Sequence, residues 1–386
     1  MFIEGFQTAK DYLDDFMARA LRAKVSDIHM ENRGAEGIIR VRIEGTMIEW
    51  ARFPVDRMLL LVRRIKFISG LDPEHSGRTG EGRFEFELAT QKIVMRLSIL
   101  PTSGSDDVVI RILGSSPEAF GLRELNFDDT IREGLEFCVN KSMGLILVTG
   151  PTGSGKTSTL YAAIQEINDG TNKIITVEDP IEYKVSGLSQ IKMDARHNVT
   201  YANVLRGVLR HDPDVILIGE CRDIEAAEIA IEASMTGHLV LTTLHTNSAV
   251  SSILRLINLG VQAIDVSNAL TAAYAQRLIR KLCPHCKKEI KTPDAMIQHM
   301  GSAAPKKVYT ATGCDQCAHT GFKGRMPVGE LLIIDDDIRD VIIATPNLSS
   351  LNKIAKQKGM RSMLDYGLHL VANGELDYKD VISAVS

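Results

Sequence analysis

The sequence predicts an α/β protein built from two domains, and three observations carry this prediction. Apolar runs alternate with helical patterns from Asp128 onward, which is typical of a parallel sheet with helices on both faces. A glycine-rich loop, Gly150–Ser158, joins one such strand to the following helix. The residues before about 120 instead show several alternating strands and two helices, which indicates a smaller α+β domain.

Composition describes a globular chain of 386 residues, long enough for two or three domains. Hydrophobic residues make up 44% of the chain, as in globular proteins. The formal net charge is −4, so the chain lacks the excess positive charge that would attract nucleic acid. No apolar run approaches the roughly 20 residues of a membrane-spanning helix, and Met1–Lys10 lacks a signal pattern. We therefore expect a cytoplasmic protein, in which the six cysteines are metal ligands or free thiols rather than disulfides.

The first domain is expected to span residues 1–120. Its strands alternate apolar and charged residues, as in Ile39–Ile43, which indicates one buried and one solvated face. Ser115-Ser116-Pro117 is expected to begin the linker to the second domain. In order, the predicted elements are a helix with Leu13, Phe16, Met17, Ala20 and Leu21 on one face, the strand just named, a helix over Asp56–Ser69, and strands at Arg83–Leu88, Ile93–Ile99 and Val108–Leu113.

The second domain is expected to span residues 121–386. Its apolar runs are short and continuous, as in strands of a parallel sheet that are buried on both faces. Beyond Asp335 the sequence predicts short helices broken at Pro346, Gly359 and Gly374. The predicted parallel strands are Leu145–Thr149, Ile174–Val177, Val215–Ile218 and Leu239–Thr243.

The stretch Gly150-Pro151-Thr152-Gly153-Ser154-Gly155-Lys156-Thr157-Ser158 fits the phosphate-loop pattern Gly-x-x-x-x-Gly-Lys-[Ser/Thr]. Its glycines let backbone N–H groups approach phosphate, and the helix N-terminus adds a positive dipole end. Lys156 can reach the β- and γ-phosphates of a nucleotide, and the Thr157 hydroxyl can bind Mg²⁺. An ordinary glycine-rich turn is the less favoured interpretation, because a strand pattern precedes the loop and a helix pattern follows it.

Two acids follow predicted strands and are candidates for catalysis. Glu220 comes after Val215–Ile218, where phosphate-binding folds place the acid that holds Mg²⁺ directly or through water. We prefer it to Asp214, which we expect to be structural. Glu178 directly follows Ile174–Val177 and is expected to orient the attacking water. A solvated acidic turn is the alternative interpretation of this second stretch.

Histidines and arginines supply further groups that could contact phosphate. His238 and His245 flank the predicted strand Leu239–Thr243; each can be structural, but in a nucleotide fold such a pair can sense the γ-phosphate. Arginine suits bidentate contact with phosphate, although most single arginines are solvated surface residues. The arginines that recur at strand or helix ends are Arg96, Arg111, Arg206, Arg210 and Arg222.

Two Cys-x-x-Cys pairs, Cys283-Pro-His-Cys286 and Cys314-Asp-Gln-Cys317, lie 27 residues apart. They predict a closed structural zinc site with four thiolate ligands, Cys283, Cys286, Cys314 and Cys317. Nearby histidines are alternative ligands, but four cysteines already complete a tetrahedron. A zinc ribbon that binds nucleic acid is the competing interpretation, supported by Lys287-Lys288 and Lys306-Lys307.

Together these motifs resemble the assembly ATPases of type II secretion and type IV pili, a branch of the secretion ATPase superfamily. The resemblance covers nearly the whole chain and is far more specific than the phosphate loop alone. The stretches that carry it stand in the family order: Ser26–His29, Met95–Thr102, Val109–Leu113, Gly150–Ser158, Ile175–Tyr183, Leu205–Asp223, Thr236–Asn247, and Ala275–Arg280 before the cysteines.

By this resemblance, the fold is a RecA-like phosphate-loop motor domain with a PAS-like α+β N-terminal domain. A zinc-binding insertion at about 281–325 and C-terminal helices at about 335–386 complete it. The protein is expected to be a homohexamer that binds ATP and Mg²⁺ at the cleft between the domains. Arg96 and Arg111 are expected to swing onto the phosphates as that cleft closes. The arginines expected to line the cleft or the subunit boundary are Arg206, Arg210 and Arg222.

We therefore expect an ATPase that powers assembly of a type IV pilus or a type II secretion pseudopilus at the inner membrane. Its expected partners are an inner-membrane platform protein and a membrane-bound recruitment partner, and no nucleic acid. A pilus retraction motor is an alternative, but retraction-type members generally lack the four-cysteine insertion. A nucleic-acid motor or zinc-ribbon module is the alternative of another class, and the net charge of −4 weighs against it.

The chain departs from the family pattern in three places. It is expected to start too late to contain all of the additional N-terminal domain by which members of this branch usually dock on a membrane-bound partner. Thr79–Arg83 stands where the family often has Pro-Gln-Asp-Gly-Arg. Cys221 stands at a position that is commonly aliphatic, where cysteine can pack as a small hydrophobic residue.

Overall fold

A computed structural model of the chain describes residues 8–74, 77–88, 91–102, 105–113, 121–193 and 200–385. The chain separates into two compact units, Met1–Pro117 and Glu118–Ser386. The linker expected to begin at Ser115 lies outside the described residues. In the described part of the chain, no helix is both long enough and apolar enough to cross a membrane.

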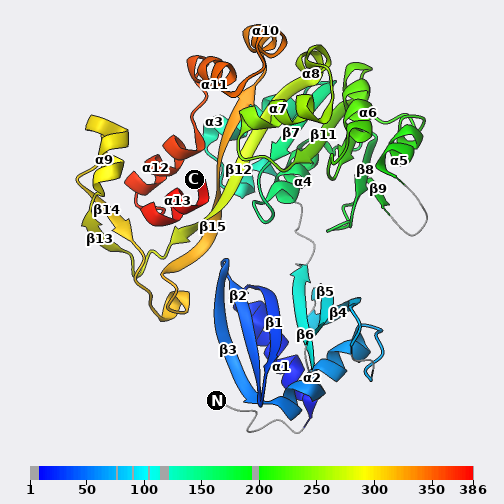
Figure 1. The fold of residues 1–386 in the computed structure, drawn as a ribbon, viewed down its shortest axis with the longest axis vertical. Helices are drawn as coiled ribbons and strands as arrows, with labels where there is room; N and C mark the ends of the chain where they lie inside the picture. Colours follow the sequence, from blue (N-terminus) through cyan, green and yellow to red (C-terminus); the bar gives the residue numbers. More distant parts are fainter. Residues whose placement is uncertain are drawn as a thin grey trace. The chain divides into compact units, whose positions relative to one another are not determined.

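The smaller unit is a six-stranded antiparallel sheet of order β3-β2-β1-β6-β5-β4, with two helices on one face (Figure 1). Side chains such as Phe16, Met58 and Ile65 fill the space between the helices and the sheet. This arrangement confirms the predicted helices and alternating strands. The elements are α1 (Ala9–Arg22), β1 (Val25–Arg33), β2 (Glu36–Ile43), β3 (Thr46–Pro54), α2 (Val55–Ile68), β4 (Gly80–Leu88), β5 (Gln91–Thr102) and β6 (Ser105–Leu113).

The larger unit contains a seven-stranded sheet of order β15-β12-β7-β11-β10-β8-β9. All neighbours run parallel except β12 and β15, which are antiparallel. The four predicted parallel strands are confirmed as β7, β8, β10 and β11. The strands are β7 (Gly144–Thr149), β8 (Ile174–Glu178), β9 (Ser189–Lys192), β10 (Val215–Ile218), β11 (Leu239–Leu244), β12 (Leu270–Leu282) and β15 (Phe322–Ile333).

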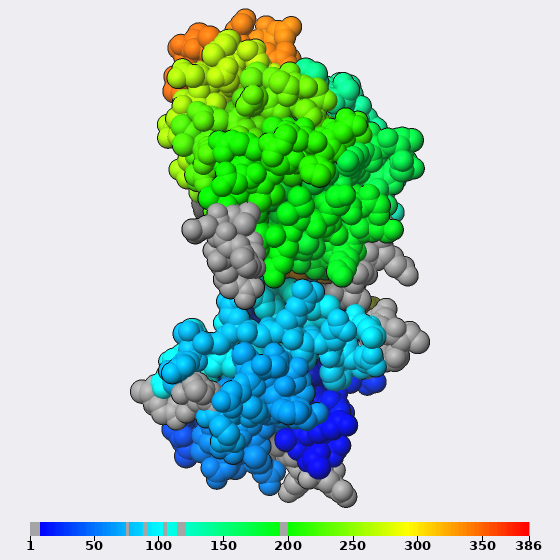
Figure 2. All heavy atoms as spheres, turned by 90° about the vertical axis from the view of Figure 1, so that its right-hand side faces the viewer, coloured from blue at the N-terminus to red at the C-terminus, as the bar shows by residue number. Residues whose placement is uncertain are grey.

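Helices cover both faces of this sheet. α3 and α4 contact each other, while α6, α7 and α8 form a second group, and members of both groups contact the central strand β7. In Figure 2 the residues coloured green, which include α5 and α6, form one face of the larger unit. These helices are α3 (Asp129–Val139), α4 (Lys156–Ile167), α5 (Tyr201–Val208), α6 (Ile224–Met235), α7 (Ala249–Leu259) and α8 (Ala263–Ala269), and a short 3₁₀ turn, Leu122–Leu125, precedes them.

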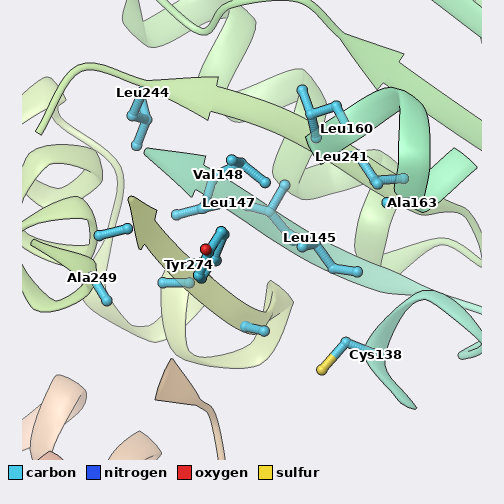
Figure 3. Packing of buried hydrophobic residues seen from close by; sticks show 14 of the residues in the cluster. Cys138, Leu145, Leu147, Val148, Leu160, Ala163, Leu241, Leu244, Ala249 and Tyr274 are labelled. Carbon is cyan, nitrogen blue, oxygen red and sulfur yellow. The ribbon is translucent and has the colours of Figure 1, made fainter. Parts of the chain in front are cut away.

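The core of the larger unit is centred on β7, which is buried along its whole length. Figure 3 shows its side chains between those of the neighbouring strands and of α4. Burial on both faces explains why the strand is a continuous apolar run rather than an alternating one. The labelled residues of this core are Cys138, Leu145, Leu147, Val148, Leu160, Ala163, Leu241, Leu244, Ala249 and Tyr274.

The two longest strands of this sheet, β12 and β15, were not predicted from the sequence. β12 contains several alanines followed by polar residues, so it matches neither strand pattern. β15 contains Gly324, Pro327 and Gly329, which normally argue against a strand. Proline is tolerated there because β15 is an edge strand, whose outer side has no neighbour in the sheet.

A small module lies between β12 and β15 in the sequence, and a group of helices follows β15. Figure 1 shows the module beside α12 and α13, away from α5 and α6. The helices confirm the short, interrupted helices predicted beyond Asp335. The elements are β13 (Lys288–Lys291), α9 (Asp294–Met300), β14 (Lys307–Thr310), α10 (Asp336–Ala344), α11 (Leu348–Gln357), α12 (Met363–Ala372) and α13 (Tyr378–Val385), with 3₁₀ turns at Gly301–Ala303 and Asp315–Cys317.

Candidate nucleotide site

The glycine-rich loop joins β7 to α4 and adopts a backbone that requires glycine. Gly150, Gly153 and Gly155 have φ angles of 149°, 79° and 91°, which other residues rarely adopt. A Cβ atom at Gly150 would also lie 2.5 Å from the carbonyl oxygen of Gln276. The loop is therefore shaped by glycine at these positions, as expected of a cradle of backbone N–H groups for an anion.

Lys156 is the first residue of α4 and lies across this loop. Its Nζ donates to the carbonyl oxygens of Gly150 and Pro151, at 2.9 and 3.1 Å. Burial lowers the pKa of Lys156 overall, although the negative charge of Glu220 acts in the opposite direction. Ser154 adds a buried hydroxyl oxygen that has no hydrogen-bond partner in the described part of the chain. The loop thus offers a cation, a hydroxyl and a helix N-terminus to a phosphate.

Gln276 of β12 supports the loop from the neighbouring strand. Its Nε2 donates to the Ser154 carbonyl oxygen at 2.6 Å, and its Oε1 accepts from the Thr159 hydroxyl of α4 at 2.7 Å. The next residue, Arg277, donates to the carbonyl oxygen of Asn247 at 3.2 Å. Neither Gln276 nor Arg277 was selected as a site residue from the sequence. The available signal was a pair of polar residues within an otherwise apolar stretch.

Glu220 lies just after β10, at the edge of the sheet where the phosphate loop leaves β7. Its Oε2 accepts from Nε of Arg222 at 2.8 Å, and its Oε1 is 3.2 Å from Nε2 of His245. Its charge also acts on Lys156. The structure therefore brings four of the predicted site residues to one edge of the sheet. Parallel strands place their carboxyl ends together, which is why residues distant in sequence meet here.

Glu178 is the last residue of β8, which neighbours β10 at the same edge. It is only 4% exposed, so the alternative interpretation of a solvated acidic turn is wrong for this residue. Both carboxylate oxygens accept hydrogen bonds. Oε2 accepts from the Tyr161 hydroxyl of α4, and Oε1 accepts from Thr176 at 2.6 Å and Gln190 at 3.3 Å. The buried charge is thus stabilised by donors from α4, β8 and β9.

His238 is not brought to this site, which corrects the expectation that both histidines contact the γ-phosphate. It precedes β11 at the opposite edge of the sheet, where its carbonyl oxygen accepts from the Gly144 N–H at 3.1 Å. The phosphate loop begins beyond Thr149, which is paired with Leu244 at the other end of these strands. A six-residue strand separates the two edges by roughly 17–20 Å. The His238 Nδ1 instead lies 2.9 Å from the Ala233 carbonyl oxygen.

Arg206 and Arg210 lie at the end of α5 and just beyond it, and both are exposed. Nη2 of Arg206 pairs with Glu225 at 2.8 Å. In the described residues, no hydrogen bond or ion pair connects either arginine to the phosphate loop. Of the three arginines expected near the nucleotide in this unit, Arg222 alone contacts a site residue within the described part of the chain, through Glu220.

Arg96 and Arg111 lie in the smaller unit, opposite each other on β5 and β6. Arg96 donates to Glu81 at 2.9 Å, and Arg111 donates to Asp27 at 2.8 Å. Burial would raise the pKa of Asp27, but hydrogen bonds from Arg111 and Ser26 lower it overall. The side chains of Arg96 and Arg111 remain 44% and 63% exposed, respectively. Like charges placed opposite each other in a sheet are unfavourable, and an anion that bridges them would relieve that repulsion.

The four cysteines of the two Cys-x-x-Cys pairs gather in the module between β12 and β15, with all four Sγ atoms within 4.8 Å of one another. Three separations are 4.0 Å (Cys283 to Cys314), 3.8 Å (Cys286 to Cys317) and 3.8 Å (Cys314 to Cys317). Zn–S bonds of about 2.3 Å in a tetrahedron require S–S distances of about 3.8 Å, so the thiols fit zinc.

The backbone around one of these thiols, that of Cys317, favours thiolate. Burial would raise the pKa of Cys317, but N–H groups of Cys314 and Gly321, each 3.2 Å from its Sγ, lower it to about 6. Such N–H···S bonds are typical of the outer shell of a thiolate metal site. Among the described residues, the only metal-binding cluster of this kind consists of these four cysteines.

Comparison with known proteins relates the whole chain to one family. The family model described as "Type II/IV secretion system protein" matches residues 3–383. The chain is 38% identical over 372 residues to the type II secretion system protein E of Pseudomonas aeruginosa, covering 96% of this chain and 74% of that protein. It is 34% identical over 379 residues to the type IV pilus assembly ATPase PilB of Thermus thermophilus, covering 97% of this chain and 43% of that protein.

A solved structure shows the same fold. The crystal structure of the pilus retraction motor PilT with bound ADP matches with a TM-score of 0.63 at 29% identity, covering 96% of each chain. The expected architecture of a RecA-like motor domain, a PAS-like N-terminal domain, a cysteine-bearing insertion and C-terminal helices is therefore confirmed.

Proposed function

The chain belongs to the type II/IV secretion system protein family and is an ATPase of it, and we propose that it powers fibre assembly as a Mg²⁺-dependent homohexamer. The fibre is a type IV pilus or a type II secretion pseudopilus at the inner membrane. One observation carries the proposal most strongly. Lys156 and two carboxylates, Glu178 and Glu220, lie at one edge of a parallel sheet in a chain that matches assembly relatives along nearly its full length.

In this proposal each residue of the site has a defined role. Lys156 exchanges its carbonyl partners for the β- and γ-phosphates of ATP. Thr157 and Glu220 hold Mg²⁺, which supplies positive charge to the phosphates when bound. Glu178 orients the attacking water, and His245 keeps Glu220 in place through their contact.

The arginines provide charge to the reaction from outside the phosphate loop. Arg96 and Arg111 of the smaller unit approach the phosphates, because their side chains are exposed and guanidinium groups suit bidentate contact with phosphate oxygens. Arg206, Arg210 and Arg222 line the nucleotide site or the boundary between subunits. Their exposure in the single chain supports this role. His238 has no part in the proposal.

The cysteine module binds one structural zinc per chain. Cys283, Cys286, Cys314 and Cys317 provide four thiolates, and the Sγ separations support tetrahedral coordination. Four protein ligands leave no open position for water, so zinc stabilises the module and takes no part in hydrolysis.

The motor acts at the cytoplasmic side of the inner membrane and is held there by partners. We expect a platform protein that receives the motion of the ring and a membrane-bound partner that recruits it. The support is the similarity to a type II secretion protein E and to a pilus assembly ATPase.

A pilus retraction motor is the second candidate, favoured by the match to the PilT structure. We prefer assembly because the PilB and protein E relatives are 34% and 38% identical, against 29% for PilT. The four-cysteine module also resembles the assembly branch rather than retraction-type members.

The biochemical part of the proposal is tested on the purified chain. We expect a species of six subunits by light scattering with nucleotide present, and ATP turnover that requires Mg²⁺. A monomer that remains without turnover across protein concentrations and nucleotides would contradict the hexameric motor.

A further inference from the structure

The Tyr161 hydroxyl connects the helix of the phosphate loop to the candidate catalytic carboxylate. Tyr161 lies in α4, five residues after Lys156, and its hydroxyl donates to Oε2 of Glu178. The helix rises about 1.5 Å per residue, so one rigid element carries both groups within roughly 8 Å along its axis. Any movement of the phosphate loop is therefore transmitted to the hydroxyl that holds Glu178.

The direction of this hydroxyl is fixed by its surroundings. The backbone of Tyr183 opposes the rise in the pKa of Tyr161, and the phenolic proton is donated to Oε2 of Glu178. The two rings pack edge to face, with centroids 5.7 Å apart at 64°. Gln190 fixes the same segment, because its Nε2 donates to the Tyr183 carbonyl oxygen at 2.8 Å and its Oε1 accepts from the Val185 N–H at 2.9 Å.

We propose that Tyr161 is a positioning residue for ATP hydrolysis, which holds the Glu178 carboxylate in a fixed orientation relative to the phosphate loop. This inference rests on the role proposed above for Glu178. A buried carboxylate with one oxygen released would rotate, and its charge would be less stable. Tyr161 would act through Glu178 and would not itself contact the nucleotide.

The charges around Glu178 make this donor important. Most of the charged groups in its region are acidic, and the Tyr161 hydroxyl supplies a hydrogen-bond donor to Oε2 of Glu178. Burial and this hydrogen bond together raise the pKa of Tyr161, so the phenol stays protonated and remains a donor. The titratable and charged groups in this region are Tyr161 on α4, Asp179 and Glu182 after β8, Tyr201 on α5, and Glu220 and Arg222 after β10.

The test is the pH dependence of ATP turnover in Tyr161→Phe, which keeps the ring and removes the hydroxyl. A carboxylate that loses a hydrogen-bond donor has a higher pKa. The acidic limb of the kcat profile should therefore move to higher pH by about one unit. At a pH on that limb, kcat should fall about tenfold while the KM for ATP changes less than about twofold. The matched control is Tyr183→Phe, which keeps the ring that packs against Tyr161 and removes a hydroxyl without a hydrogen bond among the described residues. Its profile should match the wild type.

A second variant covers the case in which Tyr161→Phe does not fold. Incorporation of 3-fluorotyrosine at position 161 keeps the shape and strengthens the donor, so the acidic limb should move to lower pH. The inference would be overturned if the acidic limb of the kcat profile stayed at its wild-type pH in both Tyr161 variants. A raised KM for ATP with unchanged kcat in Tyr161→Phe would overturn it as well. These results, obtained with an active wild-type enzyme, would leave the proposed ATPase function intact. An inactive wild-type hexamer would instead contradict the proposed function.

Discussion

At the residue scale, the ammonium group of Lys156 and the carboxylate of Glu220 have different partners within the nucleotide site. Lys156 donates to two carbonyl oxygens of its own loop, at 2.9 and 3.1 Å, and a bound phosphate replaces these neutral partners with charged ones. Glu220 has its oxygens occupied by Arg222 and His245. Binding and hydrolysis should therefore depend on different residues.

We predict that Lys156→Ala loses most ATP binding and turnover, because it removes the charge that faces the phosphates. Glu220→Gln should still bind ATP but hydrolyse it poorly, since the loop stays intact while the Mg²⁺ geometry changes. Glu178→Gln should behave like Glu220→Gln. Nucleotide binding and steady-state turnover of the purified variants test these predictions. Near-normal turnover in Glu220→Gln would contradict the role assigned to Glu220.

Gln276 allows a second prediction at this scale. Gln276→Leu keeps a similar volume but leaves the Ser154 carbonyl and the Thr159 hydroxyl without their partner in a buried place. Each unpaired group costs about 1–3 kcal/mol, so the free energy of unfolding of the larger unit should fall by about 2–6 kcal/mol. The KM for ATP should also rise, because the loop loses its support.

Denaturant unfolding and ATP kinetics give both quantities. The exposed Gln357→Leu on α11 is the control and should change neither. Wild-type stability in Gln276→Leu would show that the bracing contacts contribute nothing.

At the element scale, β12 connects the phosphate loop to the cysteine module. Gln276 contacts the loop, Arg280 pairs with Asp380 of α13 at 2.6 Å, and Cys283 follows the end of the strand. Zinc bound by the four cysteines would fix the tip of the β12–β15 pair. The module should thus fold with its metal, as small metal-stabilised modules do.

We predict about one zinc per chain when protein purified without added metal is measured by elemental analysis, since one tetrahedral site is present. Replacing Cys283 and Cys286 together with serine should abolish the metal. Cys138→Ala is the control, because this buried thiol lies outside the cluster and burial raises its pKa to about 11. Zinc that persists after the double replacement would refute the assignment.

The elements that could be predicted from the sequence are those with a local pattern, and the elements that were missed depend on contacts between distant segments. β7, β8, β10 and β11 are continuous apolar runs, and the phosphate loop and cysteine pairs are local motifs, so each is visible in a short stretch. The strands β12 and β15 are held by their pairing with each other and with β7, which no local pattern reports. The contacts of Gln276 and Tyr161 likewise depend on strand order. His238 was misassigned because a strand has two ends, and only one faces the phosphate loop.

At the scale of the whole molecule, the proposed motor joins groups from both units. Arg96 and Arg111 belong to the smaller unit, and the phosphate loop belongs to the larger one. Each arginine pairs with an acid of its own unit in the single chain. A hydrolysis cycle that exchanges those acids for phosphate would couple chemistry to movement of the units.

We predict that Arg96→Ala and Arg111→Ala stay folded but lose about 10³-fold or more in turnover, as expected when positive charge is removed from a phosphoryl-transfer transition state. Arg52→Ala is the control, because this exposed arginine of the same unit pairs, among the described residues, with Glu36 and Glu49 and with no predicted site residue. Circular dichroism and steady-state turnover check the prediction. Wild-type turnover in both variants would rule out a cleft-closing role.

The central claim is that this chain drives fibre assembly, and the most direct measurement replaces its gene in the host with the Glu220→Gln allele. We count surface fibres by electron microscopy and measure secreted protein in the medium, with the wild-type allele restored as control. The account predicts cells without fibres or without secretion, although the variant protein is present at its normal level. Cells that carry more fibres than the wild type but cannot move would contradict it and identify a retraction motor.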